Sequence, residues 1–192
     1  MIYLDYTANT PADPVVLNAF IAAEQRYIAN PNSTHIVGQQ ARAEMDRVTS
    51  SIAQRLGVQP AEIIYTSGAS EANNLAVKGI AQAARHIGKH IISTELEHSS
   101  VGASLSVLQQ QGYEIDLLRI GRDGRVDLDQ LRELLRDDTV LVAVCAVDSE
   151  LGTVQPIREI AEFVKAYPGC ACMWTQHRPL AKRTSGWTAW TP

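Results

Sequence analysis

The amino-acid sequence predicts an α/β fold in which a mainly parallel sheet is flanked by helices. Short β-prone runs alternate with segments that have the apolar spacing of a helix, an order typical of parallel sheets whose strands are joined by helical crossovers. The run over 139–147 is almost entirely apolar, as in a strand that is covered on both faces. The 192 residues, 45% of them hydrophobic and 20% charged, are enough for one substantial globular domain.

Each expected element follows from a local pattern. Apolar residues at helical spacing over 37–56 predict a helix that ends at Gly57. Further helices are expected from the turn at 67–70 onward, around 101–108, after the capping residue Asp127 and over 157–164. The expected strands are 62–66, 90–94, 113–120 and 139–147.

The composition excludes several functional classes. A net charge of -4 gives no basic surface for nucleic acid or an anionic membrane, and no apolar run approaches the roughly 20 residues of a membrane span. The first residues lack the basic and apolar regions of a signal peptide, and three cysteines are too few and too late for a disulfide framework. We therefore expect a cytoplasmic protein without nucleic-acid or membrane partners.

The composition changes near residue 170. All three tryptophans (Trp174, Trp187 and Trp190) lie in the last stretch, and no acidic residue follows Glu162. Residues 171–192 show no helical or strand period, and 172–179 have poor strand-forming residues where another strand should follow. We expect residues 1–170 to form the folded part of the chain and 171–192 to be an aberrant tail.

The segment Thr66-Ser67-Gly68-Ala69-Ser70-Glu71-Ala72-Asn73-Asn74 lies where a strand is expected to turn into a helix. Free backbone N–H groups and the positive end of the dipole make a helix start an anion site. Gly68 allows close approach of a ligand, and Ser70 can either cap the helix or donate its hydroxyl to a phosphate. An ordinary capped turn fits the same spacing.

This segment resembles the T-S-G-x-[TS]-E-x-N-N-L motif of the class V aminotransferase-like enzymes, and most closely that of the cysteine desulfurases. Further stretches are similar to the family in order and spacing between residues 2 and 170: the opening Tyr3-Leu4-Asp5-Tyr6, Asn30-Pro31-Asn32-Ser33-Thr34-His35, Glu97-His98, and Glu150-Leu151-Gly152-Thr153-Val154-Gln155-Pro156. The resemblance implies the N-terminal part of the large domain of a pyridoxal-phosphate (PLP) dependent transferase, incomplete in this chain.

The resemblance also implies roles for particular residues. Ala69 and Ser70 would contact the PLP phosphate, and His98 would stack on the pyridine ring and transfer protons. Ser149 stands where the family has an asparagine that contacts the ring hydroxyl; a serine is shorter and has no amide donor, so this contact should be weakened. Asn32 and His35 would lie near the active-site entrance, although a structural role in their loop fits equally well.

The implied activity is removal of sulfur from L-cysteine, leaving L-alanine and an enzyme persulfide that supplies acceptor proteins for iron–sulfur clusters or thiolated tRNA. The family forms homodimers. Another class V enzyme, such as a selenocysteine lyase or an aminotransferase, would share these motifs, and a non-catalytic interaction module remains an alternative. In the family, the lysine that links to PLP and the attacking cysteine lie beyond the length of this chain, and Cys145 lies in an apolar run typical of a structural thiol.

The family would continue with a strand reading roughly H-V-D-A-T-Q-A-V-G-K, whose aspartate pairs with the ring nitrogen. Met173 and Trp174 each have a single codon. A reading frame that starts at the third nucleotide of codon 172 must therefore encode His or Tyr, then Val, then Asp, and it can continue as Ala-Thr-Gln-Ala-Val-Gly-Lys. These relations predict a frameshift near codon 172 and a chain without turnover.

Overall fold

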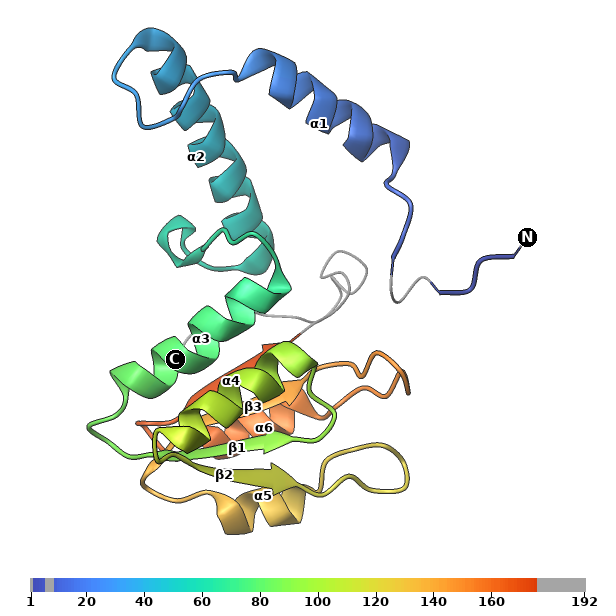
Figure 1. Cartoon of the computed structure of the whole chain (residues 1–192), viewed down its shortest axis with the longest axis vertical. Helices are drawn as coiled ribbons and strands as arrows, with labels where there is room; N and C mark the ends of the chain where they lie inside the picture. The colour runs from blue at the N-terminus through green and yellow to red at the C-terminus, as the bar shows by residue number, and fades with distance from the viewer. Residues whose placement is uncertain (1, 6–8, 176–192) are drawn as a thin grey trace. The chain divides into compact units, whose positions relative to one another are not determined.

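The structure is a computed structural model that describes residues 2–5 and 9–175 (Figure 1). These residues fall into two compact units, one up to Tyr65 and the other from Thr66 onward. No helix in the described part of the chain is both long and apolar enough to cross a membrane.

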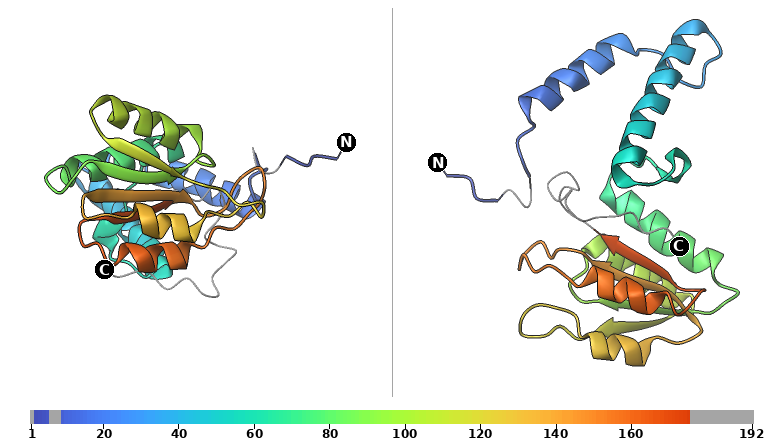
Figure 2. Two further views of the ribbon diagram at one scale, coloured as in Figure 1. Left: turned by 90° about the horizontal axis from the view of Figure 1, so that it is seen from below. Right: turned by 180° about the vertical axis from the view of Figure 1, so that it is seen from behind.

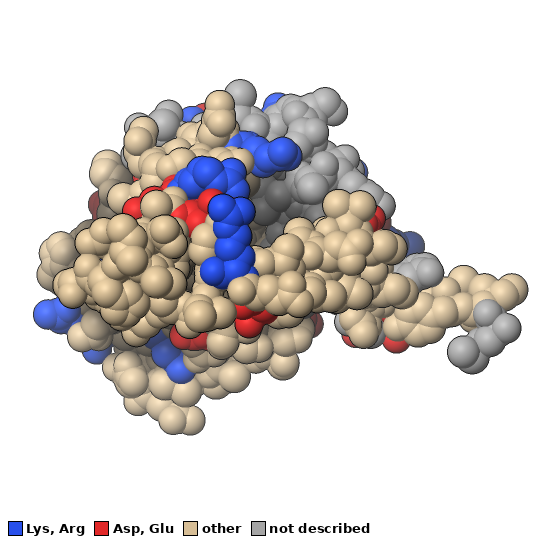
Figure 3. All heavy atoms as spheres, turned by 90° about the horizontal axis from the view of Figure 1, so that it is seen from above, with Lys and Arg blue, Asp and Glu red and all other residues tan. Residues whose placement is uncertain are grey.

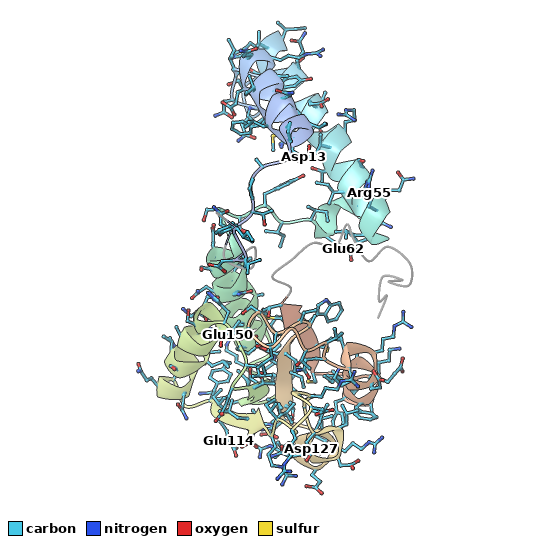
Figure 4. All side chains as sticks on the ribbon, turned by 90° about the vertical axis from the view of Figure 1, so that its right-hand side faces the viewer. Asp13, Arg55, Glu62, Glu114, Asp127 and Glu150 are labelled. Carbon is cyan, nitrogen blue, oxygen red and sulfur yellow. The ribbon has the colours of Figure 1, made fainter. Side chains whose placement is uncertain are left out.

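The first unit consists of helices α1 (Pro14–Arg26) and α2 (Ile36–Leu56) and the short 3-10 helix η1 (Pro60–Glu62). Asp13 begins α1: its carboxylate accepts a hydrogen bond from the Val15 N–H at 2.8 Å, and Pro14 has a backbone suited to the first helical position (Figure 4). The predicted helix over 37–56 is confirmed, and it ends at Gly57, whose φ of 69° is left-handed.

Apolar side chains of the first unit are widely exposed. Helix α1 has no buried residue at all. Its large exposed hydrophobic residues are Val15, Val16, Leu17, Phe20 and Ile21. Uncharged residues also cover much of the face shown in Figure 3, where Lys and Arg lie beside Asp and Glu.

The second unit is built on a four-stranded sheet in the order β2-β1-β3-β4, and every pairing is parallel. The strands are β1 (His90–Thr94), β2 (Glu114–Leu118), β3 (Thr139–Cys145) and β4 (Ala171–Thr175). Every residue of β1 and β3 is buried, as the apolar run over 139–147 predicts for β3. The predicted strand 90–94 is confirmed, and the strands predicted over 113–120 and 139–147 are confirmed with the shorter bounds of β2 and β3.

Helices cover both faces of this sheet (Figure 2). Helices α3 (Ala69–Ala83) and α4 (Ser99–Gln110) pack on one face, where Val77, Val101 and Leu105 meet Ile91 and Ala143. Helices α5 (Leu128–Leu134) and α6 (Ile157–Val164) pack on the other face, in a cluster formed by Leu131, Ile160, Val164, Ile92, Val142 and Val144. The predicted parallel α/β architecture is therefore confirmed.

Two expectations about strands are wrong. Residues 62–66 form no strand: Glu62 ends η1, and its carboxylate accepts a hydrogen bond from the Gln59 N–H at 2.6 Å. Residues 171–175, expected to begin an unstructured tail, form β4, which pairs with β3 from Leu141↔Ala171 to Cys145↔Thr175. The other tail residues, 176–192, lie outside the described residues.

Candidate active site at the carboxyl edge of the sheet

The candidate site residues of the second unit lie where the strands end and the following helices begin. Strands β1 and β3 point to the same side, and α3 and α4 begin on that side (Figure 1). In parallel sheets this edge collects loops and helix N-termini, and ligands bind there.

The start of α3 has no side-chain cap. Gly68 is the N-cap, and Ala69 and Ser70 are the first two helical residues, both exposed. The predicted alternative that Ser70 caps the helix is therefore wrong, because Ser70 already lies inside the first turn. The carboxylate of Glu71 accepts hydrogen bonds from the Ser67 N–H and hydroxyl, both at 2.6 Å, and these bonds lower the Glu71 pKa. The N–H groups of the first helical turn need partners from outside the helix, as an anion site requires.

A cavity of about 450 Å³ lies at this edge and contains His98 and Ser149. It is lined by the loop after β1, by the loop after β3 and by the end of β4 (Thr175). Ala69 and Ser70 are not among its lining residues. The structure thus brings two of the four predicted site residues into one cavity and places the other two at a separate helix start on the same edge.

His98 is the N-cap of α4. Its Nδ1 accepts a hydrogen bond from the Ser100 N–H at 3.1 Å and lies 2.8 Å from the Ser100 hydroxyl. The Asn73 amide of α3 donates to that hydroxyl at 2.9 Å. Side chains of two adjacent helices therefore fix the imidazole.

The cavity also contains Glu97, a residue for which the sequence predicted no separate role. Its carboxylate accepts hydrogen bonds from the Cys145 N–H and, at 3.3 Å, from the Thr175 hydroxyl, and so joins the ends of β3 and β4. Burial raises the pKa of Glu97 to about 7, because the charged form loses water.

The loop that carries Ser149 is held by its neighbour Asp148. One Asp148 carboxylate oxygen accepts hydrogen bonds from the N–H groups of Glu150 and Leu151, at 3.0 and 2.5 Å. Gly152 completes the turn with a φ of 70°, and an antiparallel bridge between Val147 and Val154 closes it. Ser149 is exposed on this loop.

The three cysteines have properties of structural thiols. Burial raises the pKa values of Cys145 and Cys170 to about 12 and that of Cys172 to about 11, so all three stay protonated near neutral pH. Across residues 2–5 and 9–175, no group of three or more His, Cys, Asp or Glu side chains is placed to hold a metal ion.

Asn32 and His35 belong to the first unit. His35 accepts a hydrogen bond from the Gly38 N–H at 3.2 Å and caps α2, while the Asn32 N–H donates to the Asn30 side chain at 2.8 Å. These contacts agree with the structural role in their loop that the sequence allowed for both residues.

The parallel sheet order and the helix-covered faces define an α/β domain whose candidate site lies at the carboxyl edge of the sheet. Residues 2–174 match the aminotransferase class-V family, and the chain belongs to this family. It is 42% identical over 166 residues to "Putative cysteine desulfurase IscS 1" of Bacillus subtilis and 42% identical over 167 residues to "Cysteine desulfurase, mitochondrial" of Arabidopsis thaliana. These alignments cover 86% of this chain.

Solved structures give the same result. A NifS-like protein superposes with a TM-score of 0.86 and 32% identity over 90% of this chain, and a structure titled "SspA in complex with cysteine" does so with a TM-score of 0.82 and 34% identity. The chain spans 44% of the Bacillus relative and 48% of the NifS-like chain, so it corresponds to less than half of either protein.

Proposed function

We propose that this chain forms the N-terminal part of a PLP-dependent cysteine desulfurase, an enzyme that takes sulfur from L-cysteine and leaves L-alanine. The observation that carries the proposal is the position of His98 and of the open start of α3 at one edge of the sheet, in a chain 42% identical to a cysteine desulfurase relative. The desulfurase names of the relatives favour this reading over a selenocysteine lyase, an aminotransferase or an interaction module.

The residues present fit two parts of the cofactor. The uncapped N–H groups at Ala69 and Ser70, with the Ser70 hydroxyl, would bind its phosphate. Space is open beside Gly68, where an added Cβ would meet no atom within 4 Å. The imidazole of His98 would stack on its ring, and the bound cofactor would supply an electron sink for carbanions.

Other parts of the cofactor lack their expected partners. Thr175 lies at the end of β4, where the displaced reading frame encodes the family's aspartate across codons 174 and 175. Its hydroxyl cannot keep a ring nitrogen protonated as a carboxylate does. Ser149 offers no amide donor, and Lys78 is hydrogen-bonded to Asn74 on α3 at 2.6 Å. We therefore expect weak PLP binding and no turnover by this chain.

The remaining expectations extend the proposal to the whole enzyme. We propose that the intact protein is a homodimer that passes sulfur to acceptor proteins for iron–sulfur clusters or tRNA thiolation. A cytoplasmic location stays a prediction, since the relatives include mitochondrial and mitosomal proteins.

A pair of ligands tests the phosphate site. PLP and pyridoxal, which lacks the phosphate, are titrated into the chain, and binding is followed by equilibrium dialysis. We expect PLP to bind more tightly and Ser70→Ala to weaken its binding about tenfold, since a hydrogen bond to a charged group is lost. Ser106→Ala is the control, because Ser106 is exposed on α4 and its hydroxyl is bonded to Gly102 O. Equal binding of the two ligands would count against the phosphate site.

A turnover assay tests the prediction that this chain is inactive. The chain is incubated with PLP and L-cysteine, and sulfide and alanine are measured. We expect neither product above the background of free PLP. Release of both products in equal amounts would contradict the prediction that this chain is inactive.

A further inference from the structure

A buried hydrogen-bonded chain leads from α3 through α4 to the imidazole of His98. Asn73 and Ser100 are nearly inaccessible, with 8% and 9% of their surfaces exposed. The Asn73 amide donates to the Ser100 hydroxyl at 2.9 Å, and that hydroxyl lies 2.8 Å from His98 Nδ1. The family resemblance implies no role for this network of hydrogen bonds.

The directions of these hydrogen bonds determine where His98 carries its proton. The Ser100 backbone N–H points at Nδ1 at 3.1 Å and can only donate, so Nδ1 must be an acceptor. The Ser100 oxygen already accepts from Asn73, which leaves its own hydrogen available to donate to Nδ1. The backbone contact requires a bare Nδ1 and the hydroxyl contact is compatible with it, so a neutral imidazole has its proton on Nε2.

We propose that Asn73 and Ser100 are positioning residues that hold His98 as the neutral Nε2–H tautomer. The inference rests on the proposed function for its purpose, because the tautomer decides which ring nitrogen of His98 carries the proton near a bound cofactor. The geometry itself belongs to α3 and α4 and exists without a ligand.

Nuclear magnetic resonance of the ¹⁵N-labelled chain, without PLP, tests the tautomer. Long-range ¹H–¹⁵N spectra at alkaline pH, where histidines are neutral, distinguish protonated from bare ring nitrogens. His98→Gln identifies the His98 signals among the five histidines. We expect a protonated Nε2 and a bare Nδ1. A protonated Nδ1 would overturn the proposal.

Variants separate the proposed role from simple helix stability. Ser100→Ala removes the hydroxyl but keeps the backbone donor, so we expect the ratio of Nδ1–H to Nε2–H tautomers to rise about threefold to tenfold, the effect of one hydrogen bond. Ser100→Thr keeps a hydroxyl and should restore the wild-type ratio. Ser104→Ala is the matched control: Ser104 is also buried on α4, but its hydroxyl donates to the backbone oxygen of Ser100 at 2.9 Å rather than to His98.

Equal ratios in Ser100→Ala and Ser104→Ala would overturn the proposal. If Ser100→Ala does not fold, the wild-type tautomer and the Ser100→Thr spectrum still decide. Because all spectra are recorded without PLP, a failure of PLP to bind would affect the proposed function alone.

Discussion

Single side chains hold the carboxyl edge of the sheet by bonding backbone groups far away in the sequence. Glu97 bonds Cys145, and Gln155 accepts from the Val126 N–H at 3.0 Å and donates to Gly124 O at 2.7 Å. Such contacts fix loops that have little secondary structure of their own, so each should have a measurable effect on stability.

Glu97 should make the stability of the chain depend on pH. Its pKa is about 7 in the folded chain and ordinarily 4.5, so between these values the folded state binds more protons than the unfolded state. Stability from this residue is therefore present at low pH and falls as pH rises from 4.5 to 7.

Urea denaturation of wild type and Glu97→Gln over this range measures the effect. The glutamine can still accept from the Cys145 N–H, and its stability should not show this fall. Parallel pH curves for the two proteins would rule out the assigned titration.

Gln155 should stabilise the second unit through its two buried hydrogen bonds. Gln155→Ala leaves the Val126 N–H and Gly124 O without these partners, and we expect a loss of about 1–3 kcal/mol in the free energy of unfolding. Gln110→Ala, at an exposed position of α4, is the control and should change little. Urea titrations of both variants give the comparison. Equal losses in the free energy of unfolding would contradict the stabilising role of the Gln155 hydrogen bonds.

The candidate site could be predicted in part from local motifs. His98 follows a strand and does lie in the cavity with Ser149, and Ala69 and Ser70 do begin a helix. The role of Glu97 could not be predicted, because its partner Cys145 is 48 residues away and such a contact leaves no local pattern. The signal that could have found it is its position between a buried strand and His98.

At the scale of elements, the corner between α3 and β1 depends on a glycine. Gly88 lies against Asp138, and a Cβ added to Gly88 would come within 2.1 Å of Asp138 O and 2.6 Å of its Cα. Backbone cannot yield as a flexible side chain can. In contrast, a Cβ on Gly79 of α3 would meet nothing within 4 Å.

Substitution of these two glycines by alanine should change the stability of the chain in opposite directions. Gly88→Ala should destabilise the chain by about 2 kcal/mol or more, as overpacking does. Gly79→Ala should stabilise it by about 0.5–1 kcal/mol, because alanine loses less entropy in a helix. Thermal or urea unfolding decides, and a stabilised Gly88→Ala variant would contradict the close approach.

Elements were predictable where local pattern and tertiary environment agree. The strand His90–Thr94 matches the expectation because its burial agrees with its local pattern, and Asp127 (Figure 4) matches it because capping is a local interaction. Residues 62–66 have β propensity but pair with no strand in the described chain, and β4 forms despite weak propensity because β3 supplies its pairing. Helix α1 was not predicted although Asp13 and Pro14 are ordinary start signals, and none of its residues is buried by the part of the chain that the structure describes.

At the scale of the whole molecule, the exposed apolar residues of α1 should promote self-association. Val16 and Phe20 lie one turn apart, and each is 62% exposed. Val16→Glu/Phe20→Lys should lower the association seen in sedimentation velocity as concentration rises. Asn18→Glu/Ala22→Lys adds the same charge pair elsewhere on α1 and should not. Equal association of the two double variants would exclude this surface as the cause.

The frameshift proposal makes a definite prediction for the gene. The displaced frame reads Ala-Thr-Gln after its aspartate only if Thr175 is encoded by ACG, Gln176 by CAA, His177 by CAC and Arg178 by AGA or AGG. Sequencing the coding DNA past codon 172 tests this set, and a CGN codon for Arg178 would exclude the glutamine and with it the proposed frame.

Strand β4 has a consequence of another kind. Among the described strands only β3 pairs with it, and Ala171–Thr175 contains neither a charged residue nor a proline. Charged residues and prolines on an edge strand are the features that natural proteins use to stop a sheet from adding one more strand. Among the described residues, the backbone on the side of β4 away from β3 therefore offers N–H and C=O groups to which an extended segment can add by main-chain hydrogen bonds.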